Sequence, residues 1–254
     1  MLHGFAQTGR CWGPLAEALR VQRDVRCVDL PGHGGSGDVV ADVADTATLV
    51  TVQSAASSAH ARSNVLLGYS LGARVALTAA SQQAGRAGSG DTASAGRQLF
   101  DALVLISGSP GLQTSDERVA RRRSDDALAD RIESIGTAAF IDEWLSGPLF
   151  KHLDVHAQHR SERLRNEPRG LATSLRMAGT GTMDPLWDEL ASIEIPVLVM
   201  AGADDPKFAS IAVDMAVRLP RARLAIINDA GHTAHLEQSD VALAHIVEFL
   251  AALD

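Results

Sequence analysis

The chain has 254 residues, of which 46% are hydrophobic and 21% charged, a balance typical of a globular protein with a sizeable core. Its formal net charge of −8 argues against nucleic acid or an anionic membrane as the main partner, but does not exclude a local basic pocket for a small anion. Two cysteines give no disulfide framework, and no run approaches the roughly 18 apolar residues of a membrane span. We therefore expect a reduced cytoplasmic protein without membrane insertion, monomeric and built from one domain with an insertion.

The first part of the chain predicts alternating strands, loops and helices. Met1–Phe5 has the pattern of a buried strand that runs into a glycine turn, and Gly13–Leu19 that of a short amphipathic helix. The run Val25–Leu30 indicates another strand, and Pro31–Gly37 after it has loop composition throughout. A helix is expected from Thr46 to about His60. Such alternation is typical of an α/β fold with a mostly parallel sheet and helices on both faces.

The most informative stretch is the apolar run Val65–Leu67, which breaks into a Gly-x-Ser-x-Gly pattern centred on Ser70. A helical pattern follows from Leu71 to about Gln83, so the chain must turn sharply from strand to helix at Ser70. Gly68 and Gly72 fit this turn because a side chain at either place would collide across it. The bare pattern also occurs by chance in surface loops, but a strand before it and a helix after it favour a nucleophile elbow.

The middle of the chain changes composition twice. Residues 84–98 are rich in glycine and serine without apolar periodicity, which indicates a flexible surface insertion. A core strand is expected at Ala102–Ile106, and residues 113–183 then turn arginine-rich and helical without a strand pattern. We interpret residues 113–183 as a helical cap inserted into a core domain made of residues 1–112 and 184–254.

Two polar residues follow the last predicted strands, where open α/β sheets place their ligands. Asp205, with Asp204 beside it, comes after the strand Pro196–Met200, and His232 comes after the strand Leu224–Ile227. A serine hydroxyl needs an imidazole to take its proton and a carboxylate to orient that imidazole. Ser70, an aspartate and His232 supply such a set in chain order Ser, Asp, His. Taken singly, an aspartate or histidine in a loop is more often a cap or a solvated residue.

Developing negative charge on the substrate would require two backbone donors aimed at one point. The N–H of Leu71, directly after the serine, is one candidate, and the N–H of Phe5 in the His3-Gly4-Phe5 turn is the other. His235 lies at a spacing that directs it elsewhere, so we assign it a secondary place. A final helix is expected from Val241 to Leu253.

With these motifs in order, the whole chain resembles α/β-hydrolase-fold proteins. Within them it resembles the 2-succinyl-6-hydroxy-2,4-cyclohexadiene-1-carboxylate synthases of menaquinone biosynthesis. The matching segments run from residue 2 to about 237 and are Leu2-His3-Gly4-Phe5, Gly68-Tyr69-Ser70-Leu71-Gly72-Ala73-Arg74, Ser109-Pro110-Gly111-Leu112-Gln113, Ala120-Arg121, Trp144, Leu164-Arg165, Asp205-Pro206-Lys207-Phe208 and Ala230-Gly231-His232-Thr233-Ala234-His235. They include the cap, the part that usually separates hydrolase-fold families.

The resemblance implies a lyase that eliminates pyruvate from 2-succinyl-5-enolpyruvyl-6-hydroxy-3-cyclohexene-1-carboxylate without a metal or organic cofactor. Ser70 would act as a base activated by His232 and Asp205, and alignment with the family motif favours Asp205 over Asp204. The family positions that bind the carboxylates of this small anionic substrate match Arg74, Arg121 and Arg165. Arginine suits that role because its planar fork binds a carboxylate through two hydrogen bonds. Tyr69 and Trp144 match positions lining the site.

Two other classes of function stay open at this stage. A carboxylic-ester hydrolase would use the same triad, with Ser70 forming an acyl-enzyme. A non-catalytic binding protein on this fold is favoured only if the donor loop near Phe5 is disrupted. The fold alone does not separate these classes, and the cap arginines favour the lyase. The chain departs from the family in having Ala73 where a glycine is common, and in having only Met1 and Leu2 of a central strand. We therefore expect N-terminal strands of the fold to be missing from this sequence.

Overall fold

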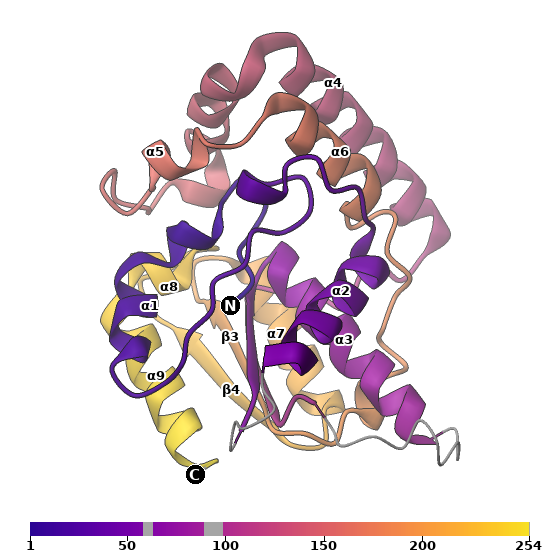
Figure 1. The fold of residues 1–254 in the computed structure, drawn as a ribbon, viewed down its shortest axis with the longest axis vertical. Coiled ribbons are helices and arrows are strands. Elements are labelled where there is room, and N and C mark those ends of the chain that lie inside the picture. Colours follow the sequence, from indigo (N-terminus) through magenta and orange to yellow (C-terminus); the bar gives the residue numbers. More distant parts are fainter. Residues whose placement is uncertain (58–62, 89–98, 254) are drawn as a thin grey trace.

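A computed structural model describes residues 1–57, 63–88 and 99–253 of the chain. Figure 1 shows a sheet between two layers of helices, with a third group of helices above the sheet's upper edge. The strands are β1 (Val65–Tyr69), β2 (Ala102–Ile106), β3 (Val197–Gly202) and β4 (Ala222–Ile227). The helices are α1 (Gly13–Arg20), α2 (Val43–Ser57), α3 (Leu71–Gly88), α4 (Ser115–Leu145), α5 (Arg160–Arg163), α6 (Pro168–Ala178), α7 (Pro206–Arg218), α8 (Ala234–Glu237) and α9 (Ser239–Ala251).

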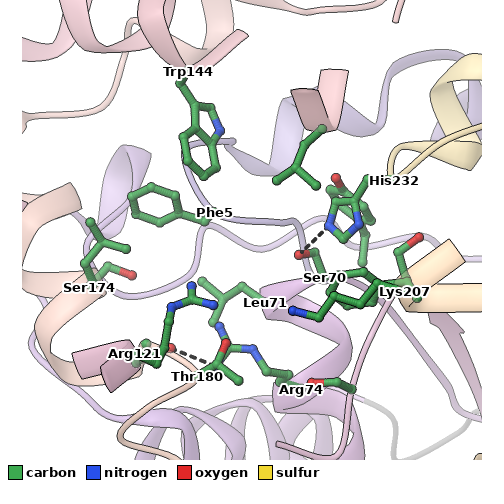
Figure 2. Close-up of a pocket in the computed structure, with 18 of the residues that line it drawn as sticks. Phe5, Ser70, Leu71, Arg74, Arg121, Trp144, Ser174, Thr180, Lys207 and His232 are labelled. Carbon is green, nitrogen blue, oxygen red and sulfur yellow. Dashed lines mark hydrogen bonds between the residues drawn. The ribbon is translucent and has the colours of Figure 1, made fainter. Parts of the chain in front are cut away.

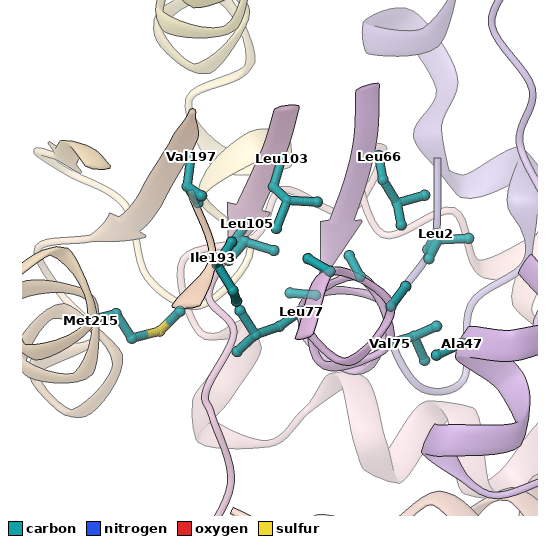
Figure 3. Packing of buried hydrophobic residues seen from close by; sticks show 14 of the residues in the cluster. Leu2, Ala47, Leu66, Val75, Leu77, Leu103, Leu105, Ile193, Val197 and Met215 are labelled. Atoms are coloured by element: carbon teal, nitrogen blue, oxygen red, sulfur yellow. The ribbon is translucent and has the colours of Figure 1, made fainter. Parts of the chain in front are cut away.

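The named strands form a parallel sheet in the order β1-β2-β3-β4. Each register is set by apolar side chains that alternate between the two faces, as β2 shows. Leu103 and Leu105 pack with α3 and α7 on one face, whereas Val104 and Ile106 pack with α1 and α9 on the other. Figure 3 shows the first of these clusters, with Leu77 of α3 packed beneath Leu103 and Leu105. Because the strands are parallel, their carboxyl ends meet at one edge of the sheet.

The first residues of the chain lie beside β1. Leu2 forms single parallel bridges to Val28 and Gly68, its N–H donates to the Leu67 carbonyl at 2.8 Å, and its carbonyl accepts from Tyr69 N–H at 3.0 Å. Leu2 is also buried in the main core cluster. Met1 and Leu2 therefore hold the place next to the elbow strand. The expectation that further strands precede them concerns residues outside this chain and stays a prediction.

Two sequence expectations need correction. Val25–Leu30 is not a regular strand. Within the described residues its backbone pairing consists of the bridge at Val28, the Val28 N–H donated to the Met1 carbonyl, and the Met1 amino group donating to the Arg26 carbonyl. The Met1–Leu2 segment beside it is too short to support a longer ladder. Helix α3 runs on to Gly88, into the segment expected to be irregular, because a formed helix gains one hydrogen bond for each residue added. The rest of that predicted insertion, residues 89–98, lies outside the described residues.

The helices between β2 and β3 have a core of their own above the sheet edge. Helix α4 begins at a capping box in which Thr114 and Glu117 satisfy each other's backbone N–H groups. It breaks at Gly136, whose φ of 78° lies in the left-handed region that glycine tolerates. Buried side chains from α4, such as Ile132 and Phe140, pack against Leu171 of α6 and against Ala6 of the core. Within the described residues, no helix is long and apolar enough to cross a membrane.

Candidate active site

Ser70 lies at the bend between β1 and α3, at the carboxyl edge of the sheet. Its φ of 51° is unusual for a residue with a side chain, and such strain persists only where the surroundings enforce it. Here the backbone on either side of Ser70 is packed very closely against its neighbours. A Cβ on Gly68 would lie 2.3 Å from the Gly72 carbonyl oxygen, and one on Gly72 would lie 2.0 Å from the Leu2 carbonyl oxygen. The two glycines are therefore required by the tight turn that presents the Ser70 hydroxyl.

His232 and Asp205 complete a hydrogen-bonded chain with Ser70, drawn in part in Figure 2. The Ser70 hydroxyl lies 3.1 Å from His232 Nε2, and His232 Nδ1 lies 2.8 Å from an Asp205 carboxylate oxygen. Burial opposes ionisation of Asp205, but the hydrogen bond and charge of His232 outweigh it, so the pKa of Asp205 is lowered. Asp205 therefore keeps its negative charge and holds the Nδ1–H tautomer, which leaves Nε2 free to take the proton of Ser70.

Asp204, the competing acid, points elsewhere. Its carboxylate lies 3.9 Å from His152 Nε2, and both side chains are substantially exposed. Asp205 is also the N-cap of α7, where its second oxygen accepts from the Phe208 N–H at 3.3 Å. The Phe208 ring in turn packs edge-on against His232, with 4.4 Å between centroids. The turn into α7 thus orients the carboxylate behind the imidazole.

Glu237, which the sequence did not single out, fixes the loop that carries His232. One of its oxygens accepts from Gly231 N–H at 2.6 Å, and the other accepts from Thr233 N–H at 3.0 Å. The Thr233 hydroxyl donates to it as well. The backbone on both sides of His232 is therefore bonded to one carboxylate on α8. An H-x-x-x-x-E spacing is the only sequence signal for it, and it points to this role once the loop is seen.

The N–H groups of Leu71 and Phe5 both belong to residues that line the same cavity as Ser70. Leu71 is the first residue of α3, so its N–H has no carbonyl one turn earlier in the helix. Within the described residues, no hydrogen bond occupies the Phe5 N–H. Both donors are thus available to a ligand oxygen, as the oxyanion prediction requires.

Two buried histidines support the loop that presents Phe5. His33 Nε2 accepts from Ala6 N–H at 3.2 Å, and His3 Nε2 accepts from Leu30 N–H at 3.0 Å. The opposite ring nitrogens face the carbonyls of Pro31 and Gly4 and therefore donate. Both rings are neutral in this arrangement. Burial lowers the pKa of His3 well below its usual value, and it lowers the pKa of His33 to about 4.

This arrangement predicts acid sensitivity. The unfolded chain binds a proton at a histidine pKa of about 6.5, whereas folded His33 does so only at about 4, so stability present at neutral pH is lost as the pH falls between these values. The difference corresponds to about 3 kcal/mol for His33. Denaturant unfolding at several pH values should show this decline, and His33→Gln, which keeps an acceptor near Ala6, should show a shallower one. An unchanged slope would assign the acid sensitivity to other groups.

A cavity of about 230 Å³ opens above Ser70, between the sheet edge and helices α4 and α6. It is lined by both core and cap residues, and Figure 2 shows several of them. From the core come Phe5, Tyr69, Ser70, Leu71, Arg74, Ser107, Ser109, Asp205, Lys207, Phe208 and His232, and from the cap Arg121, Leu128, Trp144, Leu149, Phe150, Ser174, Leu175, Ala178, Gly179 and Thr180. Residues of the predicted core and of the predicted cap therefore both line the site.

Two of the predicted arginines meet in this cavity. Arg74 is buried, and its guanidinium donates to the Ala178 carbonyl at the end of α6 at 2.8 Å. Burial, assisted by the nearby charge of Arg121, lowers the pKa of Arg74 to about 10, so it stays charged at neutral pH. Arg121 donates to Asp125 at 2.8 Å, and burial raises the pKa of that carboxyl. Two cations share one carboxylate, which leaves net positive charge for an anion.

The structure does not bring the third predicted arginine into the cavity. Arg165 is largely exposed and lies 3.6 Å from Glu162, a neighbour in the same turn. Its neighbour Arg163 is instead fully buried and donates to the carbonyls of Ala6 and Gln158. Lys207 also lines the cavity, although the sequence pattern assigned it no role there. The Arg165 prediction is thus corrected in position, because Arg165 lies in the turn after α5, where its side chain faces solvent.

The two aromatic residues predicted at the site, Trp144 and Tyr69, have different surroundings. Trp144 packs against Phe5, Phe140 and Phe150 and lines the cavity, and within the described residues its indole N–H has no partner. Tyr69 is buried between His232 and His235, and burial raises its pKa, so it stays neutral. In the part of the chain that the structure describes, no cluster of His, Cys, Asp or Glu is placed to hold a metal ion.

Comparisons with known proteins agree with this architecture. Residues 1–246 match the model of the Alpha/beta hydrolase family. A 2-succinyl-6-hydroxy-2,4-cyclohexadiene-1-carboxylate synthase from Klebsiella pneumoniae subsp. pneumoniae is 33% identical, over 99% of this chain and 92% of that protein.

Solved structures give the same result. MenH from S. aureus superposes with a TM-score of 0.88 at 34% identity, covering 99% of this chain and 92% of that one. A thermophilic esterase from Thermogutta terrifontis shares the fold, with a TM-score of 0.79 at 23% identity over 99% of this chain and 88% of that one. This chain therefore belongs to the alpha/beta hydrolase family and, within it, to the family of the 2-succinyl-6-hydroxy-2,4-cyclohexadiene-1-carboxylate synthases.

Proposed function

We propose that the protein is a carbon-oxygen lyase of menaquinone biosynthesis. It eliminates pyruvate from 2-succinyl-5-enolpyruvyl-6-hydroxy-3-cyclohexene-1-carboxylate and forms 2-succinyl-6-hydroxy-2,4-cyclohexadiene-1-carboxylate. The observation that carries the proposal is the placement of Arg74 and Arg121 in the cavity of the Ser70, His232 and Asp205 chain. This substrate carries several carboxylates, and a buried Arg74 with a partly exposed Arg121 beside it is suited to bind them. A cytoplasmic location fits such a soluble intermediate.

The geometry supports a proton abstraction. Ser70, with its hydroxyl proton drawn to His232 Nε2, removes the proton from the ring carbon that bears the succinyl group. The electron pair forms a new ring double bond, the existing double bond shifts by one position, and the bond from the ring to the enolpyruvyl oxygen breaks. Enolpyruvate leaves and becomes pyruvate. During the reaction negative charge spreads onto the succinyl ketone oxygen, which the N–H groups of Phe5 and Leu71 stabilise.

A direct assay tests the proposal. The purified protein should release pyruvate from the cyclohexene substrate, detected by coupling to lactate dehydrogenase, and should turn over simple aryl esters poorly. Rapid ester hydrolysis with an acyl-enzyme burst and no pyruvate would favour the second candidate, a carboxylic-ester hydrolase. That candidate is supported by the same Ser70–His232–Asp205 geometry, which equally suits acyl transfer. The intact geometry disfavours a non-catalytic binding protein.

The arginines provide a test of substrate class. A charge-assisted hydrogen bond to a carboxylate is worth roughly 1.5–3 kcal/mol, so Arg74→Ala and Arg121→Ala should each lower kcat/KM by about ten- to a hundredfold. Lysine at either position should restore part of the loss, because it keeps the charge without the two-pronged geometry. Steady-state kinetics with the anionic substrate and with a neutral ester measure the difference. Equal losses on both substrates would contradict a carboxylate pocket.

Two further variants serve as comparisons. Arg176 lies on α6 but pairs with Asp130 and Glu133 on the outside of the cap, so Arg176→Ala should leave kinetics nearly unchanged. Arg165→Ala tests whether this residue binds substrate, as the family resemblance implies, or lies outside the site, as in the structure. Because the Arg165 side chain lies outside the cavity and pairs with Glu162, we expect kcat/KM to fall by about threefold or less.

A further inference from the structure

Ser174 presents an unpartnered hydroxyl to the cavity. It lies on α6, is only 5% exposed, and lines the cavity that contains Ser70. Within the described residues, its Oγ has no hydrogen-bond partner. Figure 2 shows the side chain directed from α6 towards the open space below Phe5. A buried hydroxyl without a partner is costly to the folded protein, so a ligand is the natural partner to seek.

The fold itself does not require a hydroxyl at this position. Helix α6 packs so closely on the Pro31–Gly32 turn that a Cβ on Gly32 would lie 2.8 Å from Ser174 Cβ. This contact involves only the Cβ of Ser174, so packing at the position needs a Cβ but no hydroxyl. Alanine would meet that need with better helix propensity and no polar group to bury. A serine inside a helix commonly donates to the carbonyl four residues earlier, but Ser174 makes no such bond to Gly170.

The position of Ser174 relative to the cations defines what it would recognise. Ala178, whose carbonyl accepts from Arg74, lies four residues later on the same helix, about 6 Å along its axis. Arg121 lines the same cavity, close enough to Arg74 for its charge to lower the pKa of Arg74. A ligand carboxylate bound at Arg74 and Arg121 would therefore place a neighbouring oxygen within reach of Ser174.

We propose that Ser174 binds the ring hydroxyl of the substrate, on the carbon next to the one whose carboxylate is held by Arg74 and Arg121. The identity of the substrate rests on the proposed function. A serine hydroxyl both donates and accepts, which matches a ligand hydroxyl. The succinyl ketone oxygen is assigned to the N–H groups of Phe5 and Leu71. The enol ether oxygen can only accept, so the ring hydroxyl is the substrate group that matches both capacities of Ser174. Ser174 thus determines specificity for a β-hydroxy acid on a six-membered ring.

Binding of two simple acids tests this without turnover. The probes are 2-hydroxycyclohexane-1-carboxylate, as separate cis and trans isomers, and cyclohexane-1-carboxylate, which lacks only the hydroxyl. Isothermal titration calorimetry should show the wild-type protein binding one hydroxy isomer about tenfold more tightly than the parent acid. Ser174→Ala should bind all three acids equally and with the affinity of the wild type for the parent acid. A wild type with no preference, or a preference that survives in Ser174→Ala, would overturn the proposal.

Companion variants separate recognition from packing. Ser174→Cys keeps the size but donates weakly, so it should lose most of the preference, whereas a packing role would leave it like the wild type. Ser146→Ala, an exposed cap serine whose hydroxyl donates to the Glu143 carbonyl, should keep the full preference. Thermal unfolding adds a second readout. Ser174→Ala should have an equal or higher Tm, while a lower Tm together with unchanged ligand preference would assign Ser174 a structural role.

The outcomes also separate this inference from the proposed lyase activity. If the protein releases no pyruvate but still prefers the hydroxy acid through Ser174, the subsite stands and the reaction must be reassigned. If pyruvate is released and kcat/KM is the same in Ser174→Ala as in the wild type, the lyase stands and the subsite is wrong.

Discussion

Ser70→Ala is expected to lower kcat for pyruvate release by about 10³- to 10⁵-fold, because the proton acceptor itself is removed while the cavity is kept. His232→Ala should cost nearly as much, since Ser70 loses the imidazole 3.1 Å away that draws off its proton. The double variant should be little worse than either single variant, because groups that act as a unit give losses that do not add. Single-turnover kinetics with pyruvate detection measure all three.

Folding is the necessary control for these variants. Ser70 has a φ of 51°, where alanine and serine meet a similar steric cost because both carry a Cβ. Ser70→Ala should therefore unfold at nearly the wild-type temperature. Circular dichroism and thermal unfolding check this. Losses in kcat that simply multiply in the double variant would show that Ser70 and His232 act in separate steps.

The second large effect concerns the acid. Asp205→Asn is expected to lower kcat by about 10⁴-fold, because an amide facing His232 Nδ1 stabilises the wrong tautomer. The effect on folding should be small, since the asparagine oxygen can still accept from Phe208 N–H and cap α7. The loss should therefore appear in kcat and not in the unfolding temperature.

Asp204→Asn is the matched comparison, with the same chemical change one residue earlier. Its carboxylate faces His152 at 3.9 Å in an exposed pair, an interaction worth about 1 kcal/mol or less. Kinetics close to those of the wild type are expected. Equal losses in the two variants, or a larger loss for Asp204→Asn, would contradict the assignment of Asp205 as the carboxylate that orients His232.

Local signals in the sequence were sufficient for the elbow and for its partners. The pattern around Ser70 is dictated by a turn too tight for side chains at Gly68 and Gly72, and steric rules of this kind depend on a few consecutive residues. The positions of Asp205 and His232 follow from parallel strands, because every strand in such a sheet ends at the same edge. The prediction of a strand at Val25–Leu30 was wrong because a strand needs a paired neighbour, and the segment's own sequence does not show whether one is present.

Cap residues were harder to place because they depend on long-range packing. Arg163 is the last residue of α5 and Arg165 lies in the turn after it. Only the docking of this segment on the core decides which of the two is buried. Lys207 and Ser174 line the cavity from α7 and α6, whose orientation no local pattern fixes. Glu237 likewise acquires its role only when α8 folds back onto the His232 loop.

The bonds between the cap and the donor loop have a consequence for access to the site. Arg163 donates to the Ala6 carbonyl, while Asn166 donates to the Gln7 carbonyl and accepts from Gly34 N–H, so this part of the cap is tied to the residues around Phe5. A hinge that lifted residues 163–166 off the core would also displace the Phe5 amide. Motions that admit substrate and release pyruvate are therefore expected to leave residues 163–166 in place, so that the tied side keeps the Phe5 amide in register through successive turnovers.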